Sequence, residues 1–233
     1  MLLKGEYQEV KFTKLFPPYN GYQSTLDLVP TFLDELEVDY IDLVLMHAPK
    51  MPLALNDCGS LSDKECRQVT WKALSELKEK GIMRNIGVSN VNISQLEEIK
   101  EVKGGAPIAN LQMQYNAFVP PKQHETFDFC MENDISVTAY TPVGGVVDKS
   151  KANNSSLIAE LSSKYGKSTY QILLRWVVQK GAAVIPGTGN PSHMKDNLDV
   201  YSWSLSDEDM ERMIELRSSE EAKKMMYFDM SEF

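Results

Sequence analysis

A histidine and a lysine stand at matching ends of two successive strand-like segments. His47 ends the apolar stretch that starts at Ile41, and Lys14 ends the preceding stretch that starts at Val10. An imidazole titrates near neutral pH, and an ammonium group stabilises a neighbouring anion. Two such groups at neighbouring strand ends predict a functional site, although no obvious proton donor accompanies them.

Each of the two residues also has a purely structural interpretation. A histidine at a strand end is often only a hydrogen-bonded structural residue. A strand lysine commonly extends its apolar stem along the surface while its ammonium group stays in water. The choice between the two interpretations depends on the motifs that accompany them.

Composition predicts one globular domain over residues 1–233. Of the 233 residues 42% are hydrophobic and 24% charged, which suits a single α/β domain with a full core. The net charge is −9 and no Lys/Arg cluster stands out, so neither nucleic acid nor a membrane surface is an expected partner. No apolar run of about 20 residues is present, and residues 1–7 lack a long apolar stretch and a cleavage site, so neither a membrane span nor secretion is expected. Cys58, Cys66 and Cys130 lack metal-ligand spacing, so reduced thiols in a cytoplasmic protein without a metal are expected.

Strand-like and helix-like segments alternate along the chain. The expected strands are Glu9 to Leu15, Ile41 to His47, Asn85 to Ser89, Ala109 to Tyr115, Ser136 to Tyr140 and Ala183 to Pro186. The expected helices are Thr25 to Leu36, Asp63 to Lys80, Ser94 to Val102, Pro121 to Asn133, Ser155 to Tyr165, Thr169 to Gln179 and Ser192 to Asp199. Each expected strand is followed by a helix.

Local signals support these boundaries. Asn92 with Gln95 and Ser206 with Asp209 have the spacing of capping boxes, and Gly81 and Gly181 each follow a helix that ends in Lys. The strands are apolar on both faces, which favours parallel strands covered by helices. A TIM-type (β/α) barrel and a doubly wound sheet both remain open at this point.

In a parallel barrel, functional groups collect at the carboxyl ends of the strands. Polar residues stand at or near these ends in all six expected strands, at Lys14, His47, Ser89-Asn90, Gln112, Tyr140-Thr141-Pro142 and Pro186-Gly187-Thr188. One functional edge is therefore predicted.

Four segments, in this order, resemble successive signatures of the aldo-keto reductases. They are DYIDLVLMHAP (39–49), GIMRNIGVSN (81–90), VTAYTP (137–142) and IPGTGNP (185–191), and the resemblance runs from about Glu9 to Leu216. The family resemblance implies a TIM-type barrel, here incomplete, with about six parallel strands plus a C-terminal helix and tail. It also implies reduction of aldehydes or ketones with a nicotinamide cofactor.

The resemblance assigns roles position by position. His47 resembles the histidine that orients the substrate carbonyl, and Lys14 the lysine that lowers the pKa of a catalytic tyrosine. The residues that match the nicotinamide site and the loop along the cofactor are Ser89, Asn90, Gln112, Tyr140, Thr141 and Pro142.

The last strand and the helix after it resemble the adenosine end of the cofactor site. The matching residues are Pro186, Thr188, His193, Asp196 and Asn197, and Asn190-Pro191 favours a helix start that suits a phosphate. Gly187 and His193 depart from the strongly NADP-selective pattern, because many members of the family have lysine and arginine at these positions. The resemblance as a whole still favours NADP over NAD.

The N-terminal part departs from the family pattern. An eight-stranded member has two further βα units of about 30 residues each, which supply the acid tyrosine and an aspartate, whereas only Met1 to Gln8 precede the first strand here. Tyr19 and Tyr22 are candidate substitutes for that tyrosine. Further N-terminal sequence, a second copy in a homo-oligomer or a rearranged sheet could cover the open barrel edge.

Two functions are therefore expected as alternatives. The first is an NAD(P)H-dependent reductase of small-molecule carbonyls. The second is a catalytically silent barrel-derived protein that binds nucleotide or acts as a scaffold, as the missing tyrosine would predict. The Met-rich tail, Lys223 to Phe233, is expected to pack over the barrel.

Overall fold

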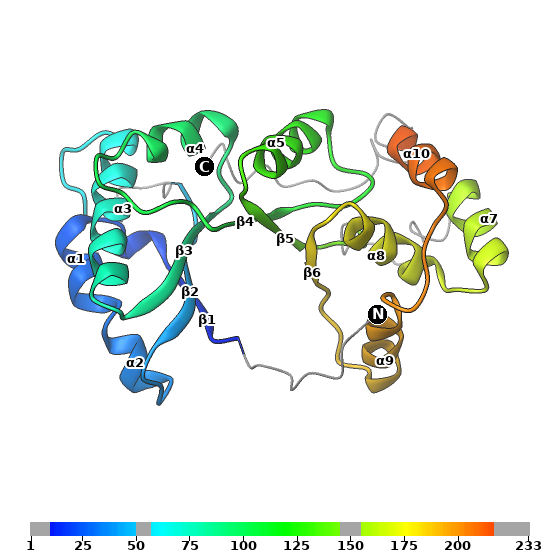
Figure 1. Ribbon diagram of the computed structural model, residues 1–233, viewed down its shortest axis with the longest axis horizontal. Coiled ribbons are helices and arrows are strands. Elements are labelled where there is room, and N and C mark those ends of the chain that lie inside the picture. The colour runs from blue at the N-terminus through cyan, green and yellow to red at the C-terminus, as the bar shows by residue number, and fades with distance from the viewer. Residues whose placement is uncertain (1–9, 50–56, 145–154, 217–233) are drawn as a thin grey trace. The chain divides into compact units, whose positions relative to one another are not determined.

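The computed structural model describes residues 10–49, 57–144 and 155–216. These residues form two compact units, which divide between Asn110 and Leu111 (Figure 1). The residue expected to open the first strand, Glu9, and the tail from Lys223 lie outside the described residues. One domain over the whole chain stays a prediction.

The strand order distinguishes the two architectures that the sequence left open. By hydrogen bonding, the described strands follow one another in chain order, β1-β2-β3-β4-β5-β6. A doubly wound sheet reverses direction at a switch point, so its strands do not run in chain order. The observed order is that of a parallel α/β barrel.

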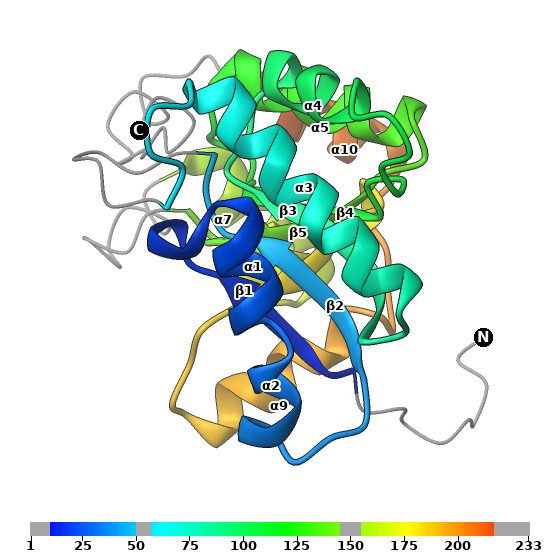
Figure 2. The ribbon, with the colours of Figure 1, turned by 90° about the vertical axis from the view of Figure 1, so that its left-hand side faces the viewer.

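Unit 1 is a parallel three-stranded segment with helices packed on it. Its strands are β1 (Phe12–Leu15), β2 (Ile41–Met46) and β3 (Met83–Ser89), with Lys14 paired to Leu45 and Leu45 to Gly87. Its helices are η1 (Pro17–Tyr19), α1 (Tyr22–Leu28), α2 (Thr31–Glu35), α3 (Asp63–Glu79) and α4 (Ile93–Lys100). Helix α3 packs on β3 and beside both α1 and α4 (Figure 2).

Helix ends in unit 1 follow local chemistry. Asn92 and Gln95 form the expected capping box of α4, and a second box, Ser62 with Glu65, opens α3. Gly81 has φ +82° after α3, and its N–H donates to the carbonyl of Lys78. This is the glycine-ended helix followed by a strand that the sequence predicts.

The expected single helix from Thr25 to Leu36 is wrong. Two helices, α1 and α2, occupy this stretch, and Pro30 lies between them as the N-cap of α2. Proline has no N–H to donate and its ring crowds the preceding turn, so the helix stops and restarts there.

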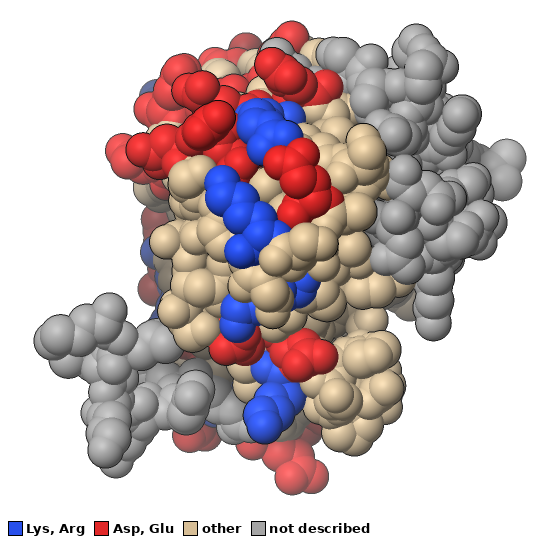
Figure 3. Space-filling view, turned by 90° about the vertical axis from the view of Figure 1, so that its right-hand side faces the viewer, with Lys and Arg blue, Asp and Glu red and all other residues tan. Residues whose placement is uncertain are grey.

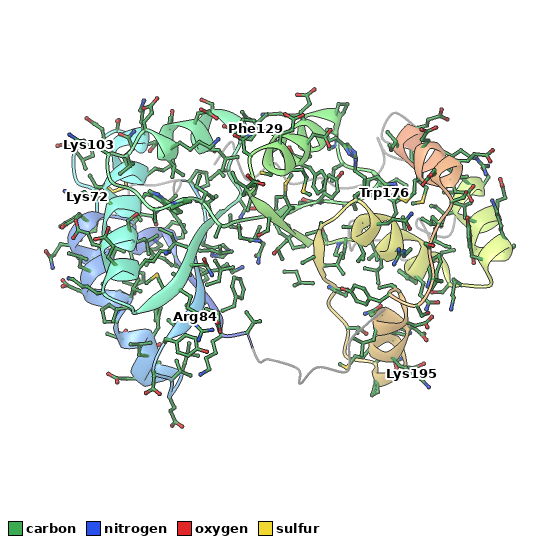
Figure 4. The ribbon with its side chains drawn as sticks, viewed as in Figure 1. Lys72, Arg84, Lys103, Phe129, Trp176 and Lys195 are labelled. Atoms are coloured by element: carbon green, nitrogen blue, oxygen red, sulfur yellow. A yellow bond between two sulfur atoms is a disulfide. The ribbon has the colours of Figure 1, made fainter. Side chains whose placement is uncertain are left out.

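Unit 2 continues the alternation. Its strands are β4 (Asn110–Gln114, of which Asn110 belongs to unit 1), β5 (Ser136–Tyr140) and β6 (Ala183–Ile185). Its helices are α5 (Pro121–Glu132), α7 (Ser156–Tyr165), α8 (Thr169–Gln179), α9 (Pro191–Asp199) and α10 (Asp207–Glu215). Trp176 of α8, labelled in Figure 4, stacks on the fully buried ring of Tyr115, which also stacks on Phe127.

Burial differs between the strands. Every residue of β4 is buried, and β2 is buried over Val44, Leu45 and Met46, as expected for strands covered on both faces. Strand β6 is different, because Ile185 is 47% exposed. In the observed order β6 has one neighbour, β5, so it is an end strand of the described sheet.

The expectation of three thiols is wrong for two of the cysteines. Cys58 and Cys66 form a disulfide with 5.5 Å between their Cα atoms, while Cys130 is a buried thiol. The chain segment before α3 folds back on the first turn of that helix, which brings the two sulfur atoms within bonding reach. A spacing of eight residues did not indicate this turn.

Charged side chains on one face of unit 2 are mixed in sign. Figure 3 shows basic side chains in a narrow band between acidic ones on this face. The ion pairs of this unit include Lys167 with Asp199 and Arg212 with Glu160. None of the helices within the described ranges is both long and apolar enough to cross a membrane.

A buried carboxylate, Asp209, joins α7 to α10. Its Oδ2 accepts hydrogen bonds from Lys164 Nζ, Tyr165 Oη and Ser206 Oγ. The expected reciprocal bond of a capping box is absent here, because the N–H of Ser206 donates to Tyr165 Oη instead. Burial by itself raises the pKa of Asp209, but these hydrogen bonds outweigh it and hold that pKa well below its usual range.

We expect Asp209→Asn to lower the free energy of unfolding by about 2–3 kcal/mol at neutral pH, because neutralising the carboxylate weakens the bonds from Lys164 and Tyr165. The pKa of Asp209 is lower in the folded than in the unfolded state. Its contribution is therefore complete above about pH 5 and is lost as the pH falls further. Urea denaturation of both proteins across this range measures the difference.

The matched control is Glu211→Gln, which removes the same charge from an exposed position of α10. This change should alter the free energy of unfolding by less than about 0.5 kcal/mol. Equal losses in the two variants would contradict a specific role for the buried carboxylate.

Candidate active site

Unit 1 brings four of the predicted site residues to one edge. Lys14 lies in β1, His47 directly follows β2, Ser89 ends β3 and Asn90 directly follows it. The N–H of His47 donates to the carbonyl of Leu15 at 2.9 Å, so the end of β2 is fastened to the end of β1. This edge is formed by the carboxyl ends of the parallel strands.

The ring of His47 is held in a partly apolar setting. Phe16 meets it edge-on, with 4.6 Å between ring centroids and planes at 89°. Its Nδ1 is buried and has no hydrogen-bond partner within the described residues. Burial lowers the pKa of His47, and the nearby charge of Lys14 lowers it further. Burial also lowers the pKa of Lys14. The imidazole of His47 is therefore neutral at neutral pH.

Asn90 holds His47 from the neighbouring strand. Its Nδ2 donates to the carbonyl of His47 at 3.0 Å and to Ser89 Oγ at 3.1 Å. Asn90 has φ +59°, a left-handed conformation that is uncommon outside glycine. Three residues before Asn90, the backbone of β3 passes close to that of β4. A Cβ at Gly87 would lie only 2.4 Å from the carbonyl oxygen of Asn110.

Unit 2 places another group of predicted residues at the ends of β4 and β5. Gln112 is buried in β4, Tyr140 closes β5, and Pro142 is buried two residues later. Thr141 has φ +48°, a genuine outlier for a β-branched residue, and its carbonyl accepts from Asn116 Nδ2 at 3.0 Å. Its Oγ1 is buried and has no partner in the part of the chain described.

Backbone strain of this kind concentrates at ligand-binding positions. A buried hydroxyl without a partner is also costly unless a ligand supplies one. The strained Thr141 with its unpaired hydroxyl therefore fits a residue that contacts a polar ligand.

The residues predicted for the adenosine end lie around the start of α9. Asn190 Oδ1 accepts from the N–H of Ser192, and the helix begins at Pro191, one residue earlier than expected. Thr188 Oγ1 accepts from the N–H of Asn190 and lies 3.4 Å from Nδ1 of His193. The remaining predicted residues are Pro186 before this turn and Asp196 and Asn197 within α9.

The residues predicted for the adenosine end are largely open to solvent. Helix α9 has no buried residue, and the side chains of His193 and Asp196 are exposed. The carbonyl of Asp196 accepts from Gln171 Nε2, which fastens α9 to α8. Across the described ranges, no group of three His, Cys, Asp or Glu residues is placed to hold a metal ion.

Tyr22 does not suit the proton-donor role considered for it. Its hydroxyl donates to Glu76 Oε2 at 2.7 Å, and Lys72 lies over its ring, on α3 as labelled in Figure 4. The bond to Glu76 raises the pKa of Tyr22, which is opposite to the effect wanted in an acid catalyst. Tyr19, which precedes it, is 48% exposed and remains a candidate.

Several contacts at these edges were not anticipated from the sequence. They come from Phe16, Asn20 and Arg67 in unit 1 and from Asn116 in unit 2. A signal existed for Asn20, which stands in the turn Pro17-Pro18-Tyr19-Asn20-Gly21. Arg67 carries no such local signal, because its contacts lie far away in sequence.

Strand order defines a parallel α/β-barrel protein, and the predicted site residues described above include several at the carboxyl ends of its strands. The family model described as the Aldo/keto reductase family matches residues 13–218. The chain therefore belongs to the aldo/keto reductase family.

Similar proteins agree with this membership. A D-galacturonate reductase from Fragaria ananassa is 32% identical over 226 residues, which cover 92% of this chain and 69% of that protein. An NADPH-dependent alpha-keto amide reductase from Saccharomyces cerevisiae is 31% identical, with 92% of this chain and 67% of that protein covered. A crystal structure of an aldo/keto reductase from Brucella melitensis has a TM-score of 0.74 at 31% identity, covering 89% of this chain and 73% of that one.

The environment of His47 leads to a direct prediction. Removing the charge of Lys14 in Lys14→Met should raise the pKa of His47 toward its ordinary value, but only partly, because burial is the larger cause. NMR titration of the histidine ring protons measures this pKa. Lys11→Met is the control, since it removes one positive charge from the residue just before β1. An equal rise in both variants would show that Lys14 is not the neighbour responsible.

Proposed function

We propose that the protein is an NAD(P)H-dependent oxidoreductase that reduces aldehydes or ketones to alcohols. The observation that carries this proposal is the edge of unit 1, where a neutral, half-buried His47 lies between Lys14 and Asn90. Relatives that are named as reductases support the same class of reaction.

The residues of this chain would act on the substrate oxygen and its proton. A neutral imidazole at His47 would hydrogen-bond the carbonyl oxygen and stabilise the negative charge that develops on it. Lys14 would lower the pKa of a tyrosine that gives the proton to that oxygen, and Tyr19 is the described tyrosine to test for this role. NADPH, when bound, supplies the hydride for the carbonyl carbon.

The cofactor would be held by the residues that the family resemblance assigns to it. Ser89, Asn90 and Gln112 would bind the nicotinamide carboxamide, and Tyr140 would stack on the ring. Thr141, with its unpaired buried hydroxyl, and Pro142 would line the cofactor, a fit supported by the strained backbone at Thr141. The adenosine end would be held by Pro186, Thr188, His193, Asp196 and Asn197.

The alternative is a nucleotide-binding or scaffolding protein without turnover. The observation that favours it is the hydroxyl of Tyr22, which is occupied by Glu76 and has a raised pKa. Unless Tyr19 gives the proton, neither of the two tyrosines considered for this role can supply it.

NADPH oxidation in the presence of 4-nitrobenzaldehyde tests the reductase proposal, and quenching of tryptophan fluorescence measures NADPH binding. We expect His47→Ala to lower kcat by about 100-fold or more, because the developing oxyanion loses a donor, while NADPH binding is retained. Tyr19→Phe should show a comparable loss if Tyr19 is the acid.

Each outcome has a definite meaning. Binding of NADPH without turnover above the His47→Ala level would replace the reductase by a silent nucleotide-binding protein. Absence of NADPH binding would leave only a scaffolding role.

The preference for NADP over NAD is tested at His193. We propose that this exposed residue faces the 2′-phosphate, so His193→Glu should weaken NADPH binding by about 10-fold through charge repulsion and change NADH binding little. The control is Leu198→Glu, which adds the same charge on α9 at a side chain that is 71% exposed. Equal losses for both cofactors, or in both variants, would contradict a 2′-phosphate contact at His193.

A further inference from the structure

Three consecutive carbonyl groups follow β2 in unit 1, and each is held by a different side chain. The carbonyl of His47 accepts from Asn90 Nδ2 at 3.0 Å, that of Ala48 from Asn20 Nδ2 at 3.4 Å, and that of Pro49 from Arg67 Nη1 at 3.3 Å. Asn20 directly follows η1, Asn90 directly follows β3, and Arg67 lies in α3. All three donor residues are buried.

The turn that carries Asn20 is itself fastened on two sides. The N–H of Asn20 donates to Pro17, and its carbonyl accepts from the N–H of Asp57 at 3.0 Å. Gly21, with φ +144°, donates to Thr70 Oγ1 on α3 at 2.8 Å. A Cβ at Gly21 would lie 2.8 Å from the carbonyl oxygen of Asp57, so glycine is required for this close approach.

Asn20 keeps one polar atom unpaired. Its side chain is 1% exposed, and Oδ1 is buried with no hydrogen-bond partner within the described ranges. A buried unpaired acceptor costs stability. Stability alone therefore explains poorly why an asparagine stands at position 20. The hydrogen bond that its Nδ2 donates to the carbonyl of Ala48 explains it better.

Arg67 connects the same segment to α4. Its Nη2 forms an ion pair with Glu98 Oε2 at 2.5 Å, while Nη1 faces the carbonyl of Pro49. The guanidinium fork can make these two contacts at once because its geometry is fixed. Mutation of Glu98 can thus remove the ion pair while the contact of Nη1 with Pro49 stays.

We propose that Asn20 and Arg67 are positioning residues that, together with Asn90, fix the backbone of residues 47–49 and thereby set the orientation of the His47 ring. This inference rests on the proposed function for its catalytic consequence. Its structural consequence, the placement of the ring against Phe16, holds whether or not the protein turns over a substrate.

The primary test is the NMR signal of the His47 ring protons. The edge-on ring of Phe16 shifts this signal, and the chain has only three histidines, so loss of one signal in His47→Gln identifies it. We expect Asn20→Leu and Arg67→Met to move the signal toward that of free histidine, because the ring is no longer fixed against Phe16.

Matched variants separate positioning from stability. Glu98→Gln weakens the ion pair of Arg67 and leaves Nη1 with Pro49, so the His47 signal should stay in place. Arg67→Lys keeps a donor and should retain most of the wild-type signal. Asn20→Leu removes a hydrogen bond together with the unpaired acceptor, so thermal melting should change little while the His47 signal moves.

Turnover of 4-nitrobenzaldehyde gives the second readout. Misplacing a catalytic group by about 1 Å costs up to about 100-fold in rate, so kcat should fall about 10- to 100-fold in Asn20→Leu and Arg67→Met. The KM for NADPH should stay near the wild-type value, and Glu98→Gln should keep wild-type kcat.

The outcomes are distinguishable. An unmoved His47 signal in Asn20→Leu and Arg67→Met would overturn the proposal, as would an equal movement in Glu98→Gln. If Arg67→Met fails to fold, Asn20→Leu with Arg67→Lys decides. A wild-type protein without turnover would overturn the reductase function, while the NMR result would still decide the positioning role.

Discussion

Backbone polar groups that leave a sheet must find partners elsewhere, and this constraint shapes unit 1. Where β2 ends, three successive carbonyls pass out of the ladder into a buried region. Each meets a buried amide or guanidinium donor from a different element. The histidine that begins this segment is consequently supported by the fold around it and not by the sheet alone.

Burial sets the electrostatics at the same edge. Lys14 and His47 are neighbours that can each carry a positive charge. Burial removes water from both side chains and lowers the pKa of each. An imidazole has the lower ordinary pKa of the two groups, so His47 is the one that is neutral at neutral pH. A neutral imidazole can donate a hydrogen bond where negative charge grows on a bound oxygen.

Local sequence patterns predicted much of this fold, whereas contacts between residues far apart in the sequence could not be predicted. The bounds of β5, the capping box of Asn92 with Gln95 and the glycine after α3 follow from neighbouring residues. Asn20 and Ala48 lie 28 residues apart, and Arg67 and Pro49 lie 18 apart, so no periodicity encodes their contacts. The disulfide was missed for a related reason, since it depends on how the segment before α3 turns back.

Asn90 adopts a left-handed backbone conformation that glycine accepts more easily. Relief of this backbone strain alone would thus favour glycine at this position. Glycine has no side-chain amide, so it would leave the carbonyl of His47 without this donor. The asparagine therefore accepts a less favourable backbone conformation in exchange for a side chain that holds the histidine.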